Sequence, residues 1–173
     1  MAMQYYAYNG PMLTTGGYAP VATGTALKTM MQLVAPAASP MLVWKWGVDF
    51  DGTASAVPVR CELLTTGTVA AAMTGTFYAT TAIQQYGTVQ GVTSAVQLGT
   101  LSLSAFNGGA ANTGEGAIVA TRTGSFNSVP MGNGDRNEWS LGREFYVPPG
   151  NVLRIRVTAP VTVNCLCWVA WEE

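Results

Sequence analysis

The chain contains no histidine. Histidine is the commonest general base, the usual partner of serine and cysteine nucleophiles, and a ligand in most catalytic zinc sites. Segments of the form G-x-G-x-x-G, G-x-x-x-x-G-K-[ST] and G-x-S-x-G are also absent from the sequence. Nucleotide-binding loops and a nucleophile elbow are therefore not predicted. We expect a protein that is not an enzyme and that has no small-molecule substrate.

Charged residues are scarce as well. They make up 10% of the chain, against about 25% in typical soluble domains. The eight Lys and Arg nearly balance the nine Asp and Glu, so no basic excess exists to bind nucleic acid or an anionic membrane surface. Contact surfaces between proteins are depleted of charge at their centres. We therefore predict a chain that works inside an assembly, as a homo-oligomer. A monomer with a surface rich in Thr, Ser and Gly is the alternative.

Long apolar runs are missing too. No segment approaches the ~20 apolar residues of a membrane helix, and the start, MAMQYYAYNGPM, lacks the basic and apolar regions of a secretion signal. We expect synthesis in a cytoplasm and no membrane partner.

Metal and cofactor sites are not predicted. The three cysteines are an odd number and form no disulfide framework. Cys165 and Cys167 lack further ligands, and since cysteine is often fully buried we interpret them as core thiols. Asp49 and Asp51 in VDFDGT lack the later oxygen ligands of a calcium loop. They predict a strand that ends in an Asp-Gly turn.

Alternating apolar and polar residues are abundant and predict β-strands. The clearest segments are MLVWKWGVDF (41–50), VPVRCELL (57–64) and VLRIRVTAP (152–160), with Arg154 and Arg156 pointing outward. The predicted inward residues are Leu42, Trp44, Trp46, Val48, Phe50, Val59, Cys61, Leu63, Leu153, Ile155 and Val157.

The last segment, NCLCWVAWEE (164–173), predicts a strand that forms a hairpin with the preceding one, turning at Ala159-Pro160. One face of this strand is apolar and belongs to the core. Leu166 and Trp168 lie on the opposite face, where a half-buried strand is normally polar. We predict that another layer covers them, either a loop of the same chain or a neighbouring subunit.

No amphipathic helix of useful length appears, and turn-forming clusters separate about eight predicted strands. The fold class is all-β: a jelly-roll-like two-sheet antiparallel sandwich with an extended N-terminal arm. The arm covers residues 1–26, and a single sandwich domain covers 27–173 with long loops around 65–138. Tyrosines are frequent at interfaces. We therefore predict interface roles for those of the arm, which are Tyr5, Tyr6, Tyr8 and Tyr18.

Three segments resemble a group of small structural proteins of tailed phages. They are ATGTALKTMMQLVAP, WGVDFDGTASAVPVRCELL and GREFYVPPGNVLRIRVTAPVTVNCLCWVAWEE. These segments cover about half of the chain, at its two ends. The resemblance is to head-decoration or cement proteins, which implies a jelly-roll module, often a homotrimer, on the capsid exterior. It implies the major capsid protein as partner and the virion as location. The alternative is a carbohydrate- or receptor-binding jelly-roll module of a phage fibre or tail, with Trp139 and Tyr146 as the aromatic platform.

Overall fold

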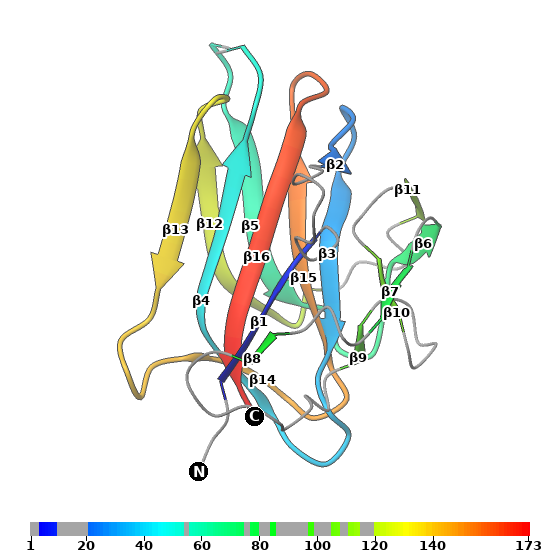
Figure 1. The fold of residues 1–173 in the computed structure, drawn as a ribbon, viewed down its shortest axis with the longest axis vertical. Helices are drawn as coiled ribbons and strands as arrows, with labels where there is room; N and C mark the ends of the chain where they lie inside the picture. The colour runs from blue at the N-terminus through cyan, green and yellow to red at the C-terminus, as the bar shows by residue number, and fades with distance from the viewer. Residues whose placement is uncertain are drawn as a thin grey trace.

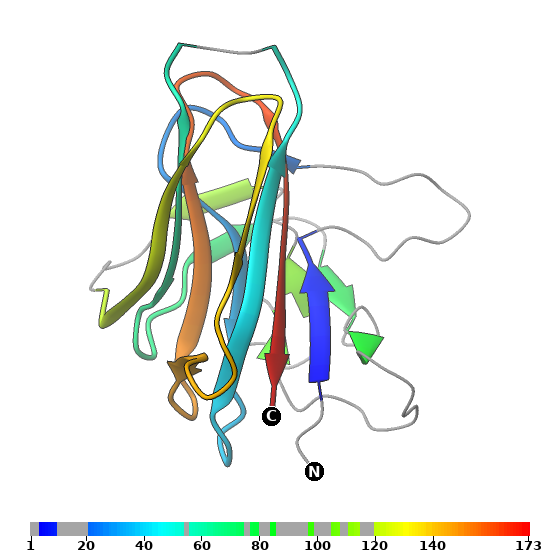
Figure 2. The ribbon, with the colours of Figure 1, turned by 90° about the vertical axis from the view of Figure 1, so that its left-hand side faces the viewer.

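The computed structural model describes residues 4–9, 21–53, 56–74, 77–79, 84–85, 97–98, 105–107, 111–114 and 120–173. Within these ranges the regular elements are all β-strands, and the long strands form two antiparallel sheets that face one another (Figures 1 and 2). The prediction of an all-β, two-sheet antiparallel sandwich is confirmed at this level. The prediction rested on alternation, which requires one apolar face per strand and hence a second sheet to cover it.

The front sheet is the one that faces the viewer in Figure 1. Its strands in spatial order are β13 (Gly134–Glu138), β4 (Met41–Phe50), β16 (Asn164–Glu172), β1 (Gln4–Tyr8) and β8 (Gln84–Gln85). Two short strands extend this order: β14 (Phe145–Val147) pairs with β4, and β2 (Val21–Ala22) pairs with β16. Strands β13 and β14 therefore follow one another along the same edge of β4.

The back sheet lies behind it. Its strands in spatial order are β12 (Arg122–Val129), β5 (Val59–Thr65), β15 (Val152–Thr158), β3 (Lys28–Val34) and β9 (Gln97–Leu98). Two small two-stranded sheets stand to the side of β3 in Figure 1. They pair β6 (Ala72–Thr74) with β11 (Ala111–Gly114) and β7 (Phe77–Ala79) with β10 (Ala105–Asn107).

The chain repeatedly crosses from one sheet to the other. Strands β3, β5, β12 and β15 lie in the back sheet, while β4, β13, β14 and β16 lie in the front sheet. Pairing joins opposite ends of the sequence: β1 with β16, β3 with β15, β4 with β13 and β14, and β5 with β12. Strands from the two ends of the sequence therefore lie side by side in both sheets.

The predicted hairpin between the last two strands is wrong. Strands β15 and β16 lie in different sheets, and the segment with Ala159 and Pro160 bridges the sandwich. The reason is that the apolar faces of both strands point into the same core, where Ile155 and Cys167 are fully buried. Alternation identifies the inward face of a strand but does not distinguish a hairpin from a pair that crosses the core.

The core lies between the sheets and contains the inward residues predicted for β5 and β15. Val59, Cys61 and Leu63 are fully buried, as are Leu153 and Val157. The largest buried side chains include two tryptophans, Trp46 of β4 and Trp171 of β16. Burial of large apolar side chains contributes about 1.5–3 kcal/mol each, which makes this layer the main source of stability.

Strand β4 differs from its predicted orientation in its first half. The register shifts so that Ala170 pairs with Lys45 and Trp171 pairs with Val43, which leaves Trp44 as an extra residue. This is a β-bulge, and it reverses the phase of the alternation. Val43 is therefore fully buried, whereas the predicted core residues Leu42 and Trp44 are only half-buried. The inward orientation predicted beyond the bulge, from Trp46 to Phe50, is confirmed.

The extended N-terminal arm is not confirmed. Residues 4–8, which were predicted to belong to it, form β1 of the front sheet, paired with β16 over their whole length. Tyr5 and Ala7 face the core, while Tyr6 and Tyr8 face outward. Because tyrosines stand on both faces of QYYAY, the alternation of this strand is hidden in the sequence.

Residues 66–71, which follow β5, contact the outer face of the back sheet at Gln32 of β3 and Arg154 of β15. The side-chain amide of Gln32 accepts a hydrogen bond from the Ala71 N–H (2.9 Å) and donates one to the Ala71 carbonyl (3.1 Å). Arg154 donates from Nη2 to the Val69 carbonyl at 2.7 Å and is fully buried. Arg156 pairs with Glu62 at 2.7 Å. The two arginines point away from the core as predicted, yet both are buried: Arg154 contacts this segment, and Arg156 lies beside Glu62.

Candidate functional site

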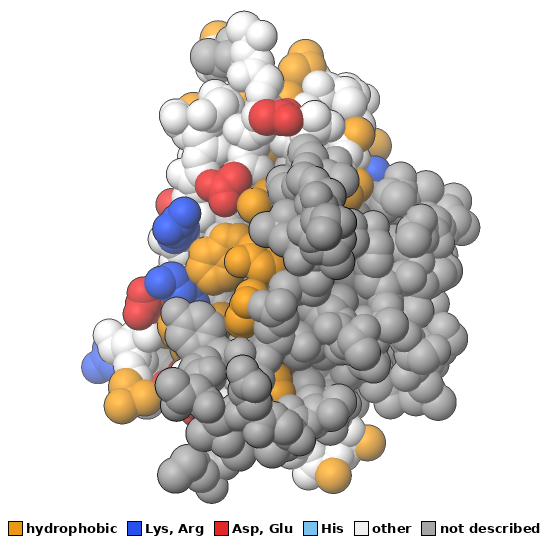
Figure 3. Space-filling view, in the orientation of Figure 1, with side chains coloured by type: hydrophobic (Ala, Val, Ile, Leu, Met, Phe, Trp, Pro, Cys, Tyr) orange, Lys and Arg blue, Asp and Glu red, His pale blue; other side chains and the backbone are white. Residues whose placement is uncertain are grey.

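An open groove of about 400 Å³ crosses the outer face of the front sheet. Its apolar lining comes from β1, β4 and β16. It consists of Tyr6, Tyr8, Trp44, Leu166, Trp168 and Ala170. Its charged lining consists of Lys45, Asp49 and Arg136. We call this the Trp168 groove. In Figure 3 hydrophobic side chains occupy the middle of the front face, with basic and acidic side chains along one border.

The register of the sheet places the centre of the groove on one cross-strand row. Tyr8 pairs with Trp168, Trp168 with Gly47, and Gly47 with Arg136. A Cβ atom at Gly47 would lie 2.7 Å from ring atoms of Trp168, which is closer than van der Waals contact allows. The indole therefore lies across the backbone of β4, and glycine is the residue that permits this. The result is a broad aromatic floor on an otherwise flat sheet.

A second cross-strand row, two residues further along each strand, forms the next part of the groove. Tyr6 pairs with Ala170, Ala170 with Lys45, and Lys45 with Glu138. The rings of Tyr6 and Tyr8 meet edge to face, with their centroids 5.6 Å apart and their planes at 88°. This is a favoured geometry for aromatic pairs. Ala170 lies between Tyr6 and Lys45 in this row, and its small side chain is buried.

The charges at the border of the groove differ in their pairing. Lys45 Nζ lies 3.2 Å from Glu138 Oε2 and 6.0 Å from the centroid of the Trp44 ring. Asp49 lies against Gly134, where no room remains for a Cβ atom. Within the part of the chain that the structure describes, neither Asp49 nor Arg136 forms an ion pair or a side-chain hydrogen bond. The groove thus presents one acidic and one basic group whose charges are not neutralised by a described partner.

Four of the six predicted interface residues come together here. Tyr6 and Tyr8 enter from β1, and Leu166 and Trp168 enter from β16. Tyr5 does not belong to the groove, because it is on the inward face of β1, 2% exposed, and stacks on Trp171 at 6.0 Å. The sixth residue, Tyr18, lies outside the described residues.

Other lining residues were not predicted from the sequence. Trp44 was assigned to the core because the bulge in β4 gives no signal in the alternation. Arg136 lies in the glycine-rich segment MGNGDRNEWS, whose composition predicts a turn although it contains all of β13. Leu166 and Trp168 are half-buried in the single chain. The additional layer that was expected over them stays a prediction.

The two residues suggested as a sugar platform lie elsewhere. Trp139 stacks on Phe145, with centroids 6.0 Å apart and planes at 23°, and packs against the core. Its backbone N–H donates to the Trp44 carbonyl at 2.9 Å. Tyr146 is 40% exposed on β14, where its register partner is Leu42. Neither residue lines the Trp168 groove.

The cysteines are core residues. Cys61, Cys165 and Cys167 are all fully buried and carry free thiols. Burial raises the pKa of the Cys61 and Cys167 thiols well above the ordinary value, and the neighbouring Cys165 adds to the rise. Both thiols are therefore protonated at neutral pH, a form that binds metals and attacks electrophiles poorly. Among the residues that the structure describes, no group of three His, Cys, Asp or Glu side chains could hold a metal ion.

A second hollow lies at one end of the sandwich, between the β4–β5 and β15–β16 connections. Its acidic side chain, Asp51, accepts hydrogen bonds from the N–H and the side-chain amide of Asn164, at 3.1 and 2.9 Å. Gly52 follows with a positive φ of 114°. The predicted strand ending in an Asp-Gly turn is confirmed. The Asp51 carboxylate links this turn to Asn164 through the two hydrogen bonds.

Comparison of this chain with known protein families, curated proteins and solved structures finds no match. The ranges that the structure describes contain no helix of the length and hydrophobicity required to cross a lipid bilayer.

Proposed function

We propose that this chain is a structural virion protein without enzymatic activity. It binds the outer surface of a phage capsid and stabilises the capsid by bridging subunits of the major capsid protein. The partners in this proposal are the major capsid protein and further copies of the chain itself, as a homotrimer.

The observation that carries the proposal is the Trp168 groove. Protein–protein interfaces are enriched in Tyr, Trp and Arg and place aromatic anchors at the centre with polar groups at the rim. Here Trp168, Tyr6 and Tyr8 form an aromatic centre, and Asp49 and Arg136 lie at its border. A flat sheet face of this composition suits a protein surface better than it suits catalysis, since no pair of catalytic groups converges on it.

The finer fold assignment supports the same proposal. In a jelly roll, two Greek keys wrap a long hairpin around a sandwich, as in many viral capsid and lectin domains. The pairings of β1 with β16, β3 with β15, β4 with β13 and β5 with β12 agree with that arrangement, as do the crossings between sheets. We therefore propose that the sandwich is a jelly roll.

The proposed stabilisation follows from differential binding. A protein that binds the assembled shell and not the free subunit favours the shell by mass action, by RT ln(1 + [L]/Kd). At about one hundred times Kd this amounts to roughly 2.7 kcal/mol for each site. Many sites per shell would add to a large effect without any covalent bond.

The direct test compares phage particles that carry this protein with particles that lack it. We expect the complete particles to retain their DNA at a higher temperature and after stronger osmotic shock. Equal resistance of the two kinds of particle would exclude the cement role. Adding the purified protein back is the control, and it should restore resistance.

A second candidate function is glycan or receptor binding by a phage fibre or tail. The specific observation in its favour is that four aromatic rings, and two charges without a partner among the described residues, line one groove of about 400 Å³. Small-ligand sites often have roughly 300–1,000 Å³ of volume and aromatic walls. Glycan-array binding that is lost in Trp168→Ala and kept in Trp139→Ala would favour it. The absence of binding to any glycan would leave the capsid proposal in place.

A further inference from the structure

The turn between β13 and β14 presents the most exposed large hydrophobic side chain of the described residues. Leu141 is 92% exposed. The turn is well defined by hydrogen bonds, because the Arg143 N–H donates to the Ser140 carbonyl at 2.9 Å and the Gly142 N–H donates to Glu144 Oε1 at 2.8 Å. Gly142 adopts a positive φ of 82°, which glycine tolerates without strain. An exposed leucine on an ordered turn can bind a partner with little loss of conformational entropy.

Two charges accompany Leu141 on this turn. Arg143 is exposed and forms no ion pair with any residue that the structure describes. Glu144 follows it and is half-buried. The Leu141 turn, defined as residues 140–144, therefore offers one apolar tip with a basic and an acidic group beside it.

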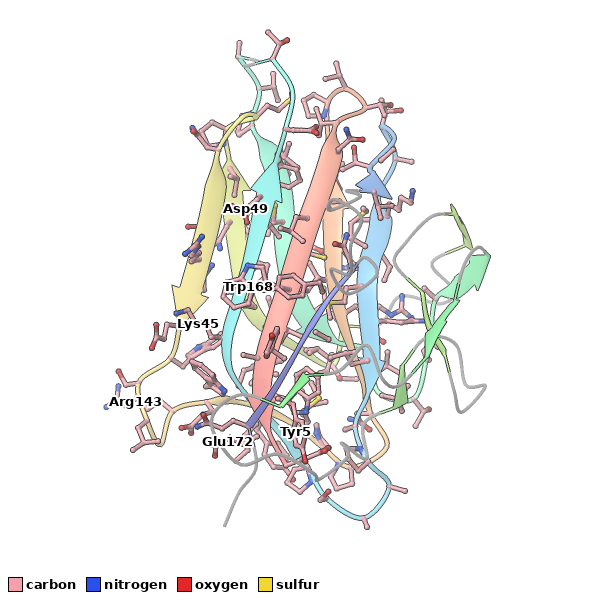
Figure 4. All side chains as sticks on the ribbon, in the orientation of Figure 1. Tyr5, Lys45, Asp49, Arg143, Trp168 and Glu172 are labelled. Carbon is pink, nitrogen blue, oxygen red and sulfur yellow. The ribbon has the colours of Figure 1, made fainter. Side chains whose placement is uncertain are left out.

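The Trp168 groove offers the complementary set. Its floor is apolar, and its border carries Asp49 and Arg136, the two groups without a described partner. Arg143 of the turn matches Asp49, and Glu144 matches Arg136. Figure 4 places Arg143 well away from Asp49 and Trp168, so the turn does not fill the groove of its own chain.

We propose that the Leu141 turn of one copy docks into the Trp168 groove of a second copy of this chain. This inference rests on the proposed function, because it takes the groove as a protein-docking surface and names the protein that occupies it. Leu141 contacts the Trp168 floor, and the two charge pairs set the orientation. Charge complementarity of this kind chiefly determines which partner binds and in which register.

The contact joins two different surfaces, so it is heterologous. A heterologous contact generates either a closed ring or an open filament. One turn in one groove buries less than the roughly 800 Å² per partner of a typical stable interface. In a closed ring each copy makes two such contacts. The last contact, which closes the ring, forms within one assembly, and its high effective concentration makes the ring more stable than a single contact would. We therefore expect a closed ring, and the homotrimer that the resemblance to cement proteins implies is one such ring.

The first experiment measures self-association of the purified full chain by sedimentation velocity and equilibrium from low to high micromolar concentration. The wild type should form one discrete oligomer. Leu141→Ser should weaken association by about tenfold or more, as truncation of a central anchor does. Val161→Ser is the matched control, since Val161 is also an exposed aliphatic residue (50%) but lies outside the turn and the groove. A wild type that is monomeric throughout, or equal association of wild type and Leu141→Ser, would overturn the inference.

The second experiment swaps the charges of the proposed pair. Arg143→Asp and Asp49→Arg should each weaken association by about tenfold, because each places like charges opposite one another. The double variant restores the attraction and should return association to within a few-fold of the wild type. Arg60→Asp, at an exposed arginine of β5 in the other sheet, should have no effect. If the double variant self-associates no more strongly than the single variant with the weaker self-association, the proposed pair between Arg143 and Asp49 would be contradicted.

These measurements separate the inference from the proposed function. If the chain is monomeric but still binds intact capsids, and Trp168→Ala abolishes that binding, the occupant of the groove is the shell. In that case the inference and the homotrimer fail, and the proposed capsid-binding role stands. If the ring forms and depends on Leu141 but does not bind capsids, the inference stands and the capsid role fails. Competition of a glycan for the groove in the isolated protein would overturn the inference in favour of the second candidate function.

Discussion

The hydrogen bonds between Gln32 and Ala71 predict how strongly residues 66–71 are held on the back sheet. Gln32 and Ala71 are both buried, and the side-chain amide satisfies both the N–H and the carbonyl of Ala71. Gln32→Leu keeps a similar volume but removes both partners. Each hydrogen bond contributes about 0.5–1.5 kcal/mol, and a buried polar group left without a partner costs about 1–3 kcal/mol. We expect the free energy of unfolding to fall by about 2–4 kcal/mol.

Urea unfolding followed by tryptophan fluorescence measures this loss, with the m-value as a check that the unfolding transition is unchanged. Gln4→Leu is the matched control. Gln4 makes its hydrogen bond to Glu172 at a half-buried position of the front sheet, where loss of one partner to water costs about 1 kcal/mol or less. A loss below about 0.5 kcal/mol in Gln32→Leu, or equal losses in the two variants, would refute the reasoning.

Three further predictions concern the Gly47–Trp168 contact and the buried cysteines. Gly47→Val adds atoms where the Trp168 ring lies, and overpacking of this kind lowers the free energy of unfolding by about 1–3 kcal/mol. The displaced ring should also change the tryptophan fluorescence spectrum. An unchanged spectrum and an unchanged stability would contradict the close approach of the Trp168 ring to Gly47. Cys61 and Cys167 should not react with a thiol reagent in the native protein at pH 8 and should react after denaturation; rapid native labelling would contradict their burial. The pKa values of both thiols are raised in the folded state, so the unfolded state loses these protons first as the pH rises. The free energy of unfolding should therefore fall above about pH 8.5, by up to 1.4 kcal/mol per pH unit for each thiol. In the Cys61→Ala variant this fall should be smaller by the contribution of one thiol.

The sequence predicted the strands whose alternation is regular. In β5 and β15 the inward residues stand at every second position, and the structure places Val59, Cys61, Leu153 and Val157 in the core as expected. These positions are predictable because a sandwich strand has one apolar face and a period of two. The same local rule supports the all-β class.

Other features depend on contacts that the local sequence does not encode. The bulge at Trp44 is set by the pairing of β4 with β16, and it moves a tryptophan from the expected core to the groove. Burial of Arg154 depends on residues 66–71, which the alternation of β15 cannot reveal. The crossing between β15 and β16 depends on the global arrangement of the sheets.

The candidate site was predictable in part for a clear reason. Leu166 and Trp168 are apolar at positions where the alternation requires polar residues, and that conflict marks a surface with a further use. Tyr6 and Tyr8 were identified by their residue type alone. Asp49 and Arg136 were not identified, because a charged residue in a turn or strand is normally just solvated, and only the register places them beside Trp168.

The central claim is that the Trp168 groove is a docking surface for protein. The most direct test is co-sedimentation of the purified protein with intact capsids that lack it, comparing Tyr8→Ala with Tyr146→Ala. Both residues are tyrosines on the outer face of the front sheet, but only Tyr8 lines the groove. We predict that Tyr8→Ala lowers capsid-bound protein by about tenfold, because loss of an aromatic anchor in the groove weakens the ring whose copies bind the shell together, while Tyr146→Ala binds like the wild type. Equal binding of the two variants would contradict the account.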